Sequence, residues 1–174
     1  MARHFAVLLS ALLIFPPATR QATAAELLVH KEKRSLTYTD GTVTRDFKVS
    51  LGFTPTGPKL EQGDGKTPEG VYYIAHKNPN SSFHLSLGVS YPNVDDAQAG
   101  LRAKLISKKE YAAIVQAIRQ HRMPPQNTRM GGAIYIHGGG SQSDWTWGCI
   151  ALNNEDIDFL YQHVKAGDKV TILK

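Results

Sequence analysis

Cysteine is almost absent from this sequence of 174 residues, which holds a single one, Cys149. A lone cysteine forms no intramolecular disulfide, and neither a Cys-x-x-Cys nor a His-x-x-x-His spacing is present to indicate a zinc site. The sequence also lacks a dense basic stripe interleaved with aromatic residues, which argues against a nucleic-acid partner. We therefore expect no metal, no other cofactor and no nucleic acid, and the thiol needs another explanation.

Long hydrophobic runs are absent as well, apart from a run at residues 5–15. That run is shorter than the roughly 20 apolar residues of a membrane-spanning helix. It follows the polar Arg3 and His4 and precedes small residues at 22–25, which is the pattern of a cleaved signal peptide. Residues 1–25 are therefore predicted to direct export to the periplasm or elsewhere in the cell envelope, with no stable membrane insertion after cleavage.

The remaining residues, 26–174, have the length of a single domain. Loss of residues 1–25 removes two of the 20 basic residues and none of the 15 acidic ones, so the net charge falls from +5 to +3. This mild positive charge is compatible with an acidic polymer such as a cell wall. We therefore expect one exported domain.

The first half of this domain has the pattern of short strands, which we predict at residues 27–31, 35–39, 42–51, 71–75 and 83–87. Asp40-Gly41 is predicted to form a two-residue hairpin turn, because both central positions of such a turn need a positive φ. Residues 54–70 are crowded with glycine, proline and charged side chains, which predicts a long ordered loop.

Two helices are predicted in the second half. Ser107 and Glu110 have the spacing of a capping box, and Pro124-Pro125 ends the apolar stripe that follows them. A second helix is predicted to begin at Asn153 or Asn154 and to end before Gly167, with a last strand at 170–173. The predicted buried face of that helix consists of Ile157, Leu160, Tyr161 and Val164. Together these elements favour a mostly β fold of the α+β class, a sandwich or barrel-like sheet with helices packed on it.

The thiol of Cys149 and the imidazole of His137, twelve residues earlier, form a candidate catalytic pair. Residue type alone favours a buried small hydrophobe for Cys149 and a histidine satisfied near a core strand for His137. Their context favours chemistry, because Gly148 permits close approach to the backbone and three glycines follow the histidine. A free thiol has a pKa of about 8.5, so a neighbouring imidazole is what makes it a competent nucleophile at neutral pH.

A backbone carbonyl that accepts the Nδ1–H of His137 would leave Nε2 free to take the thiol proton. His137-Gly138-Gly139-Gly140 also matches the oxyanion loop of lipases, but the Gly-x-Ser-x-Gly elbow of those enzymes is not in the sequence. A cysteine nucleophile with a histidine base is therefore the interpretation that the two motifs favour.

Three segments together resemble the catalytic domain family of the L,D-transpeptidases (YkuD-type). They are Ile136-His137-Gly138, then Thr146-Trp147-Gly148-Cys149-Ile150, and upstream the loop Gly63-Asp64-Gly65-Lys66-Thr67-Pro68-Glu69-Gly70. The resemblance covers nearly all of residues 26–174. It implies a single β-sandwich-like catalytic domain.

The resemblance also implies roles for individual residues. Cys149 matches the nucleophile, which attacks the carbonyl of the third residue of a peptidoglycan stem peptide and forms a thioester. His137 matches the base, and the Gly138 carbonyl matches the group that orients its imidazole. The backbone N–H groups around Trp147, Gly148 and Cys149 match the oxyanion hole.

This sequence departs from the common pattern of that family. Trp147 stands where the Ser/Thr-His-Gly-Cys motif has its second histidine, which leaves His137 as the candidate base within the motif. Ala151 stands where many members carry an arginine or asparagine that helps to hold the substrate. The spacer between His137 and Cys149 is also short, so the Asp-Trp-Thr-x-Gly-Cys form is identified as a divergent branch.

These departures leave the fate of the thioester open. Attack by an amine would make the protein an acyltransferase that cross-links stem peptides or attaches a protein to the wall. Attack by water would make it a hydrolase of cross-links or of links to a wall-anchored lipoprotein, and a non-catalytic wall-binding module is a third possibility. Trp145, His84 and Tyr91 are predicted to line the substrate cleft, with sheet packing and surface polarity as the alternative for each.

Overall fold

The computed structural model describes residues 24–174. The predicted signal peptide, residues 1–25, lies outside the described residues except for its last two positions. Within the described range, no helix is both long and apolar enough to cross a membrane.

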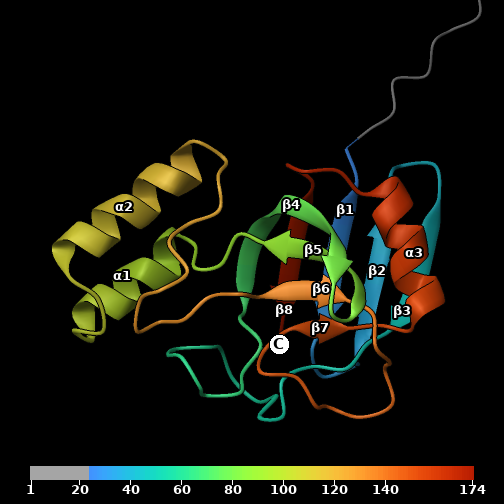
Figure 1. Cartoon of the computed structure of the whole chain (residues 1–174), viewed down its shortest axis with the longest axis horizontal. Helices are drawn as coiled ribbons and strands as arrows, with labels where there is room; N and C mark the ends of the chain where they lie inside the picture. The colour runs from blue at the N-terminus through green and yellow to red at the C-terminus, as the bar shows by residue number, and fades with distance from the viewer. Residues whose placement is uncertain (1–23) are drawn as a thin grey trace, which may run out of the picture.

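Eight strands form one sheet in the order β3-β2-β1-β8-β4-β5-β6-β7 (Figure 1). In β1, β2 and β8 buried side chains alternate with more exposed ones, so one face of this part of the sheet carries the core. The strands are β1 (Glu26–His30), β2 (Ser35–Thr39), β3 (Thr44–Lys48), β4 (Gly70–Ser81), β5 (His84–Val89), β6 (Tyr135–His137), β7 (Ile150–Ala151) and β8 (Lys169–Leu173).

Strand β4 joins two parts of the sheet. Its first four residues pair with β8, and residues from Ile74 onward pair with β5 with shifts in register. The sheet therefore curls over a common core, to which β1, β2, β5, β6 and β8 all contribute buried side chains. The predicted mostly β fold with helices is confirmed.

Helix α3 (Asn154–His163) packs against β5 and β6 and closes the core with Ile157, Leu160 and Val164. These three residues were predicted to form its buried face, and Tyr161 is only half-buried. The predicted start of the helix, near Asn153 or Asn154, is also confirmed.

The other two helices form a separate lobe beside the sheet (Figure 1). Helix α1 spans Val94–Arg102 and helix α2 spans Lys108–Arg119. They share a small core of their own, made by Ala97, Ile106, Ile114 and Met130. We call residues 93–130, which include both helices and their flanking segments, the helical lobe.

The capping box predicted for Ser107 and Glu110 is confirmed, since the Ser107 hydroxyl accepts from the Glu110 N–H and the Glu110 carboxylate accepts from the Ser107 N–H. Helix α1 was not predicted, although Asn93 and Asp96 form a capping box at its start as well. Its apolar stripe is sparse, because only Ala97 and Gly100 of the helix are fully buried.

The predicted two-residue turn at Asp40-Gly41 is wrong. Thr39 pairs with Thr44, so four residues connect β2 to β3. The Asp40 carboxylate accepts from the N–H groups of Thr42 and Val43, which stabilises the wider loop. This side chain provides turn contacts that the Asp-Gly pattern alone does not reveal.

The long loop at residues 54–70 is ordered, as predicted, and a buried lysine holds it. The ammonium of Lys31, with 3% of its side chain exposed, bonds the carbonyls of Gly57 and Thr67 and the carboxylate of Glu69. All three partners lie in the loop, so one side chain at the end of β1 fixes both ends of it. Burial lowers the pKa of Lys31, and its contact with Glu69 opposes that effect.

We expect the Lys31→Met substitution to lower the free energy of unfolding by about 3 kcal/mol, because it leaves a partly buried carboxylate and two carbonyls without their cation. Chemical denaturation measures this change. The control is Lys33→Met, which removes an exposed lysine two residues later and should shift stability by less than about 0.5 kcal/mol. Equal stability of the two variants would show that the Lys31 contacts do not stabilise the loop.

Candidate active site

Neighbouring strands bring Cys149 and His137 to the same face of the sheet. Strands β6 and β7 are parallel, with Ile136 opposite Ile150 and both side chains fully buried in the core. Because side chains alternate along a strand, the residues on either side of these isoleucines face away from the core. Cys149 and His137 therefore lie on the outer face of the same two strands.

The Cys149 thiol is held by the backbone. Its Sγ accepts from the Tyr135 N–H at 3.4 Å and donates to the Ala133 carbonyl at 3.3 Å. Within residues 24–174 no hydrogen bond joins this thiol to the His137 ring, but both side chains line one cavity of about 360 Å³. Burial raises the pKa of the thiol to about 11, while the Tyr135 N–H and the charge of Lys59 act in the opposite direction.

The His137 imidazole has a defined tautomer and a tight surrounding. Its Nδ1 lies 2.6 Å from the Gly138 carbonyl, so Nδ1–H donates to that oxygen and Nε2 carries the free lone pair. Phe83 stacks on the ring with 4.7 Å between centroids, and Trp145 meets its edge at 5.6 Å. Burial lowers the pKa of His137, so the ring is neutral at neutral pH and is available as a base.

Gly148 is required by the close approach of two backbone segments. Its φ is +122°, and a Cβ at this position would lie 2.5 Å from the Lys66 carbonyl oxygen. The turn that presents the thiol thus rests directly on the loop that Lys31 holds. Thr146 completes the turn, because its hydroxyl accepts from the Gly148 N–H and donates to the Cys149 carbonyl.

One of the three N–H groups predicted to form the oxyanion hole is already used within the turn. The Gly148 N–H is used in the bond to Thr146, at 3.1 Å. No hydrogen bond in the described part of the chain uses the N–H groups of Trp147 or Cys149. These two N–H groups are therefore the remaining candidates for the predicted oxyanion hole.

A second cavity, of about 330 Å³, is also lined by Cys149. It shares only Cys149 and Ala133 with the first cavity. The exposed ring of Trp147 forms part of its wall and packs edge-on against Phe53 at 4.6 Å. The remaining lining residues are Lys59, Gln62, Gly63, Gln126, Gly131 and Gly132.

The residues predicted to bind substrate lie elsewhere. Tyr91 is fully buried and its hydroxyl reaches the Met130 carbonyl, so the predicted substrate contact of this residue is wrong. His84 bonds Asp158 at 2.6 Å and lines neither of the two cavities that reach the thiol. Trp145 supports the imidazole of His137 and donates to the Gly140 carbonyl, but it too is outside those cavities.

Two contacts at the site were missed from the sequence. Phe83, in the turn between β4 and β5, stacks on His137 although its motif carries no catalytic signal. Ala133, with a φ of +53°, accepts from the thiol through its carbonyl, which no side-chain pattern encodes. Among the described residues, no group of three or more His, Cys, Asp or Glu side chains is arranged to hold a metal ion.

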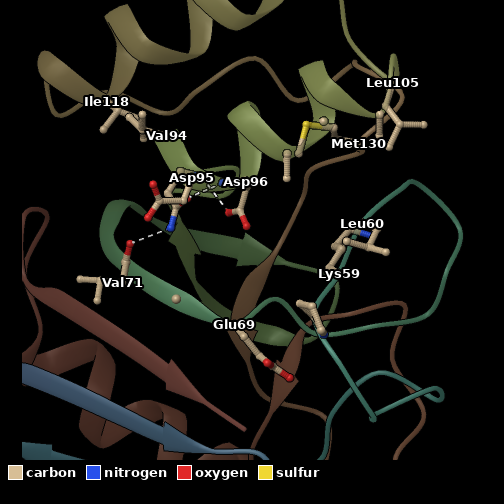
Figure 2. A pocket seen from close by; sticks show the side chains of 16 residues that line it. Lys59, Leu60, Glu69, Val71, Val94, Asp95, Asp96, Leu105, Ile118 and Met130 are labelled. Carbon is tan, nitrogen blue, oxygen red and sulfur yellow. Dashed lines mark hydrogen bonds between the residues drawn. The ribbon is translucent and has the colours of Figure 1, made fainter.

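A larger cavity of about 720 Å³ lies between the helical lobe and the body of the protein (Figure 2). Its walls are mostly apolar, with Val71 on one side and Val94, Leu105 and Met130 on the other. Neither Cys149 nor His137 lines it, so the larger size does not make it the reaction site.

Comparison with known proteins identifies a matching family. The model of the YkuD L,D-transpeptidase catalytic domain family matches residues 24–172. A curated relative, the putative L,D-transpeptidase YafK of Escherichia coli (strain K12), is 26% identical over 110 residues, which are 62% of this chain and 32% of the relative. The chain thus spans about a third of that relative's length.

Solved structures share the fold. The helical cell shape determining protein Pgp2 from Campylobacter jejuni is 25% identical with a TM-score of 0.56, over 88% of this chain and 49% of Pgp2. Bd1075 from Bdellovibrio bacteriovorus is 22% identical with a TM-score of 0.53, over 90% of this chain and 50% of its own. An L,D-transpeptidase from Mycobacterium smegmatis is 15% identical with a TM-score of 0.51, over 86% and 58%.

The raised pKa of Cys149 predicts how its alkylation depends on pH. Iodoacetamide reacts with the thiolate, so the rate should rise about tenfold per pH unit from pH 7 to 10, without a plateau at acid pH. Mass spectrometry follows the reaction, and the single cysteine makes the signal specific. A small thiol of ordinary pKa is the control and levels off above about pH 9. A plateau below pH 7 would instead reveal a preformed thiolate–imidazolium pair.

Proposed function

The chain belongs to the YkuD family of L,D-transpeptidase catalytic domains, and we propose that it is an exported cysteine acyltransferase acting on peptidoglycan stem peptides. One observation carries this proposal. Cys149 stands where two cavities meet, and His137 lines only one of them. Such a site has separate room for an acyl group and for the amine that leaves or arrives.

The first step forms a thioester on Cys149. Nε2 of His137 takes the thiol proton as Sγ attacks the carbonyl carbon of the third residue of the stem peptide. The carbonyl oxygen becomes negatively charged and is stabilised by the free N–H groups of Trp147 and Cys149. When the intermediate collapses, the C–N bond breaks and the imidazolium gives its proton to the leaving amine.

The second step is the reverse with a new partner. An acceptor amine loses a proton to His137, attacks the thioester and releases the thiol, which recovers its proton. Both the leaving and the arriving amine must be within reach of His137, so both use the cavity that this residue lines. The acyl half of the stem peptide then occupies the opposite cavity, beside Trp147 and Lys59.

The two neutral groups suit this order of events. Burial keeps the thiol protonated and the imidazole neutral before substrate arrives, so neither of these two groups carries a charge in the resting site. Proton transfer takes place when the carbonyl is in position to accept the nucleophile. Before substrate binds, the protonated thiol is a weaker nucleophile than a thiolate, and this limits its side reactions.

Hydrolysis of the same thioester is the second candidate, and one feature of the site favours it. Besides His137 and Cys149, the polar residues of this cavity are asparagines, serines and Tyr135, and its described lining contains no aspartate or glutamate to bind an incoming ammonium group. Water needs no such partner. In that case the protein would cleave cross-links, or the link to a wall-anchored lipoprotein, instead of forming them.

What is known of two similar proteins fits a substrate in the cell wall. YafK is described as a putative L,D-transpeptidase, and Pgp2 as a protein that determines helical cell shape. A cell holds its shape through its wall, so both descriptions support peptidoglycan as the polymer on which this chain acts.

We expect Cys149→Ala to abolish both turnover of muropeptides and acylation by a carbapenem, with a thermal midpoint close to that of the parent. His137→Gln should lower the acylation rate by at least about a hundredfold, because the base is lost while Cys149 remains. Intact-protein mass spectrometry measures the adduct over time. The matched control is His84→Gln, an exposed histidine outside both cavities, which should acylate at the parent's rate. Parent-like acylation of His137→Gln would assign the base to another group.

The product distinguishes transfer from hydrolysis. We expect incubation with purified tetrapeptide muropeptides to yield cross-linked dimers, detected by mass analysis, and their yield to rise with acceptor concentration. Freed tripeptides alone, or release of a lipoprotein stub from wall fragments, would instead make the protein a hydrolase. Cys149→Ala gives the background for both reactions.

A further inference from the structure

Positive charge is concentrated in the helical lobe. Residues 93–130 hold seven lysines and arginines and three acidic residues, whereas the rest of residues 24–174 holds eleven and twelve. The lobe therefore carries a net charge of +4 and the body a net charge of −1. This segregation lies behind the mild overall charge of the described chain.

None of the seven basic side chains of the lobe takes part in an ion pair within residues 24–174, and all seven are exposed. On the body, by contrast, Lys31, Arg34 and Lys59 each pair with a carboxylate. The seven lobe residues are Arg102, Lys104, Lys108, Lys109, Arg119, Arg122 and Arg129.

Four of these charges gather where α1 passes into α2. Arg102, Lys104, Lys108 and Lys109 lie within eight consecutive residues, and we call them the basic tip. Figure 1 shows the α1–α2 hairpin projecting away from the sheet, with this connection at its far end.

Nearby acidic groups offset only part of this charge. Glu110 adds one negative charge beside the tip, and its carboxylate accepts from the N–H and hydroxyl of Ser107. Asp95 and Asp96 lie in the first turn of α1, at the opposite end of that helix. The tip therefore presents an excess of positive charge to solvent, which attracts an anionic polymer.

We propose that the basic tip binds the carboxylates of intact peptidoglycan and holds the polymer on the protein. Charge complementarity is the first argument, because the stem peptides of peptidoglycan carry free carboxylates. The second is the position of the tip at the far end of the lobe (Figure 1), where a bound polymer leaves the reaction site free. The other end of the lobe leads into Gly131, Gly132 and Ala133, which line the cavity beside the thiol, so the lobe connects the tip to the reaction site.

This inference rests on the proposed function for the identity of the polymer, but it assigns a separate surface. Each exposed ion pair is weak and is screened by salt beyond a Debye length of about 8 Å at physiological ionic strength. Several such contacts on a repeating polyanion add up to a local concentration effect. The tip should therefore raise activity on the intact wall without changing the chemistry at Cys149.

Binding is tested by co-sedimentation with purified sacculi, with all proteins carrying Cys149→Ala so that no turnover occurs. The test variant is Lys104→Gln, Lys108→Gln, Lys109→Gln. The matched control is Lys33→Gln, Lys48→Gln, Lys165→Gln, which removes three exposed and unpaired lysines from the body and causes the same change in net charge.

We expect the tip variant to bind sacculi about tenfold more weakly at low salt, and the control variant to bind within about twofold of the parent. Added salt should weaken the parent more steeply than the tip variant. Sacculi with carboxylates amidated by carbodiimide and ethanolamine should lose the difference between the two. Equal binding by both variants, or unchanged binding to amidated sacculi, overturns the proposal.

Two further measurements distinguish wall binding by the tip from membrane binding and from a change in the chemistry at Cys149. Vesicles containing an anionic phospholipid test the membrane as partner, and tip-dependent binding to vesicles but not to sacculi overturns the wall assignment. Carbapenem acylation of the tip variant with Cys149 intact should match the parent. Weaker sacculus binding with normal acylation in the tip variant supports the tip as a binding surface. If the parent itself is not acylated, the proposed chemistry is contradicted, but the binding measurements still test the tip.

Discussion

The site depends on one pairing, the parallel register of β6 and β7 that places Ile136 opposite Ile150. Both isoleucines are fully buried, and their burial fixes which side chains point outward. A slip of one residue would turn the thiol into the core and an isoleucine out to solvent. The hydrophobic core thus determines the position of the reactive pair, and the loop between the strands only has to span the gap.

The same burial that orients the pair also sets its charge state. It raises the pKa of the Cys149 thiol and lowers the pKa of the His137 imidazole, so both changes favour neutral groups. The Gly138 carbonyl sets the tautomer of His137, and the rings of Phe83 and Trp145 hold the imidazole in place. The resulting pair is preorganised and neutral, which suits a reaction whose charge develops only during attack on the carbonyl.

The fold class, the positions of most strands along the chain, the capping box of α2 and the start of α3 could be predicted from the sequence, because each depends on local pattern. The two motifs also predicted that Cys149 and His137 belong together. Local patterns could not predict contacts made by backbone groups or by rings distant in sequence. The bond from the thiol to the Ala133 carbonyl and the stacking of Phe83 on His137 are examples. Tyr91 was misjudged for a related reason, since nothing in the sequence around it reveals that its hydroxyl is enclosed by the lobe.

The helical lobe is joined to the body by hydrogen bonds and borders a cavity. The hydroxyls of Tyr72 and Tyr73 in β4 donate to Asp96 and to the Arg122 carbonyl, and a cavity of about 720 Å³ lies between the lobe and the body (Figure 2). One side chain links the lobe more directly to the chemistry. The Gln126 amide bonds the Tyr91 carbonyl and also accepts from the N–H of Ala133.

Ala133 is the residue whose carbonyl receives the Cys149 thiol, so the exit of the lobe and the environment of the nucleophile share one peptide segment. Any shift of that segment changes the hydrogen bond of the thiol and the wall of the cavity next to Trp147. A lobe with its own small core can change sequence and charge without disturbing the sheet, because its buried residues pack mainly on one another. The fold therefore separates the chemistry, which the β6–β7 pairing fixes, from a surface that is free to adapt to the polymer around it.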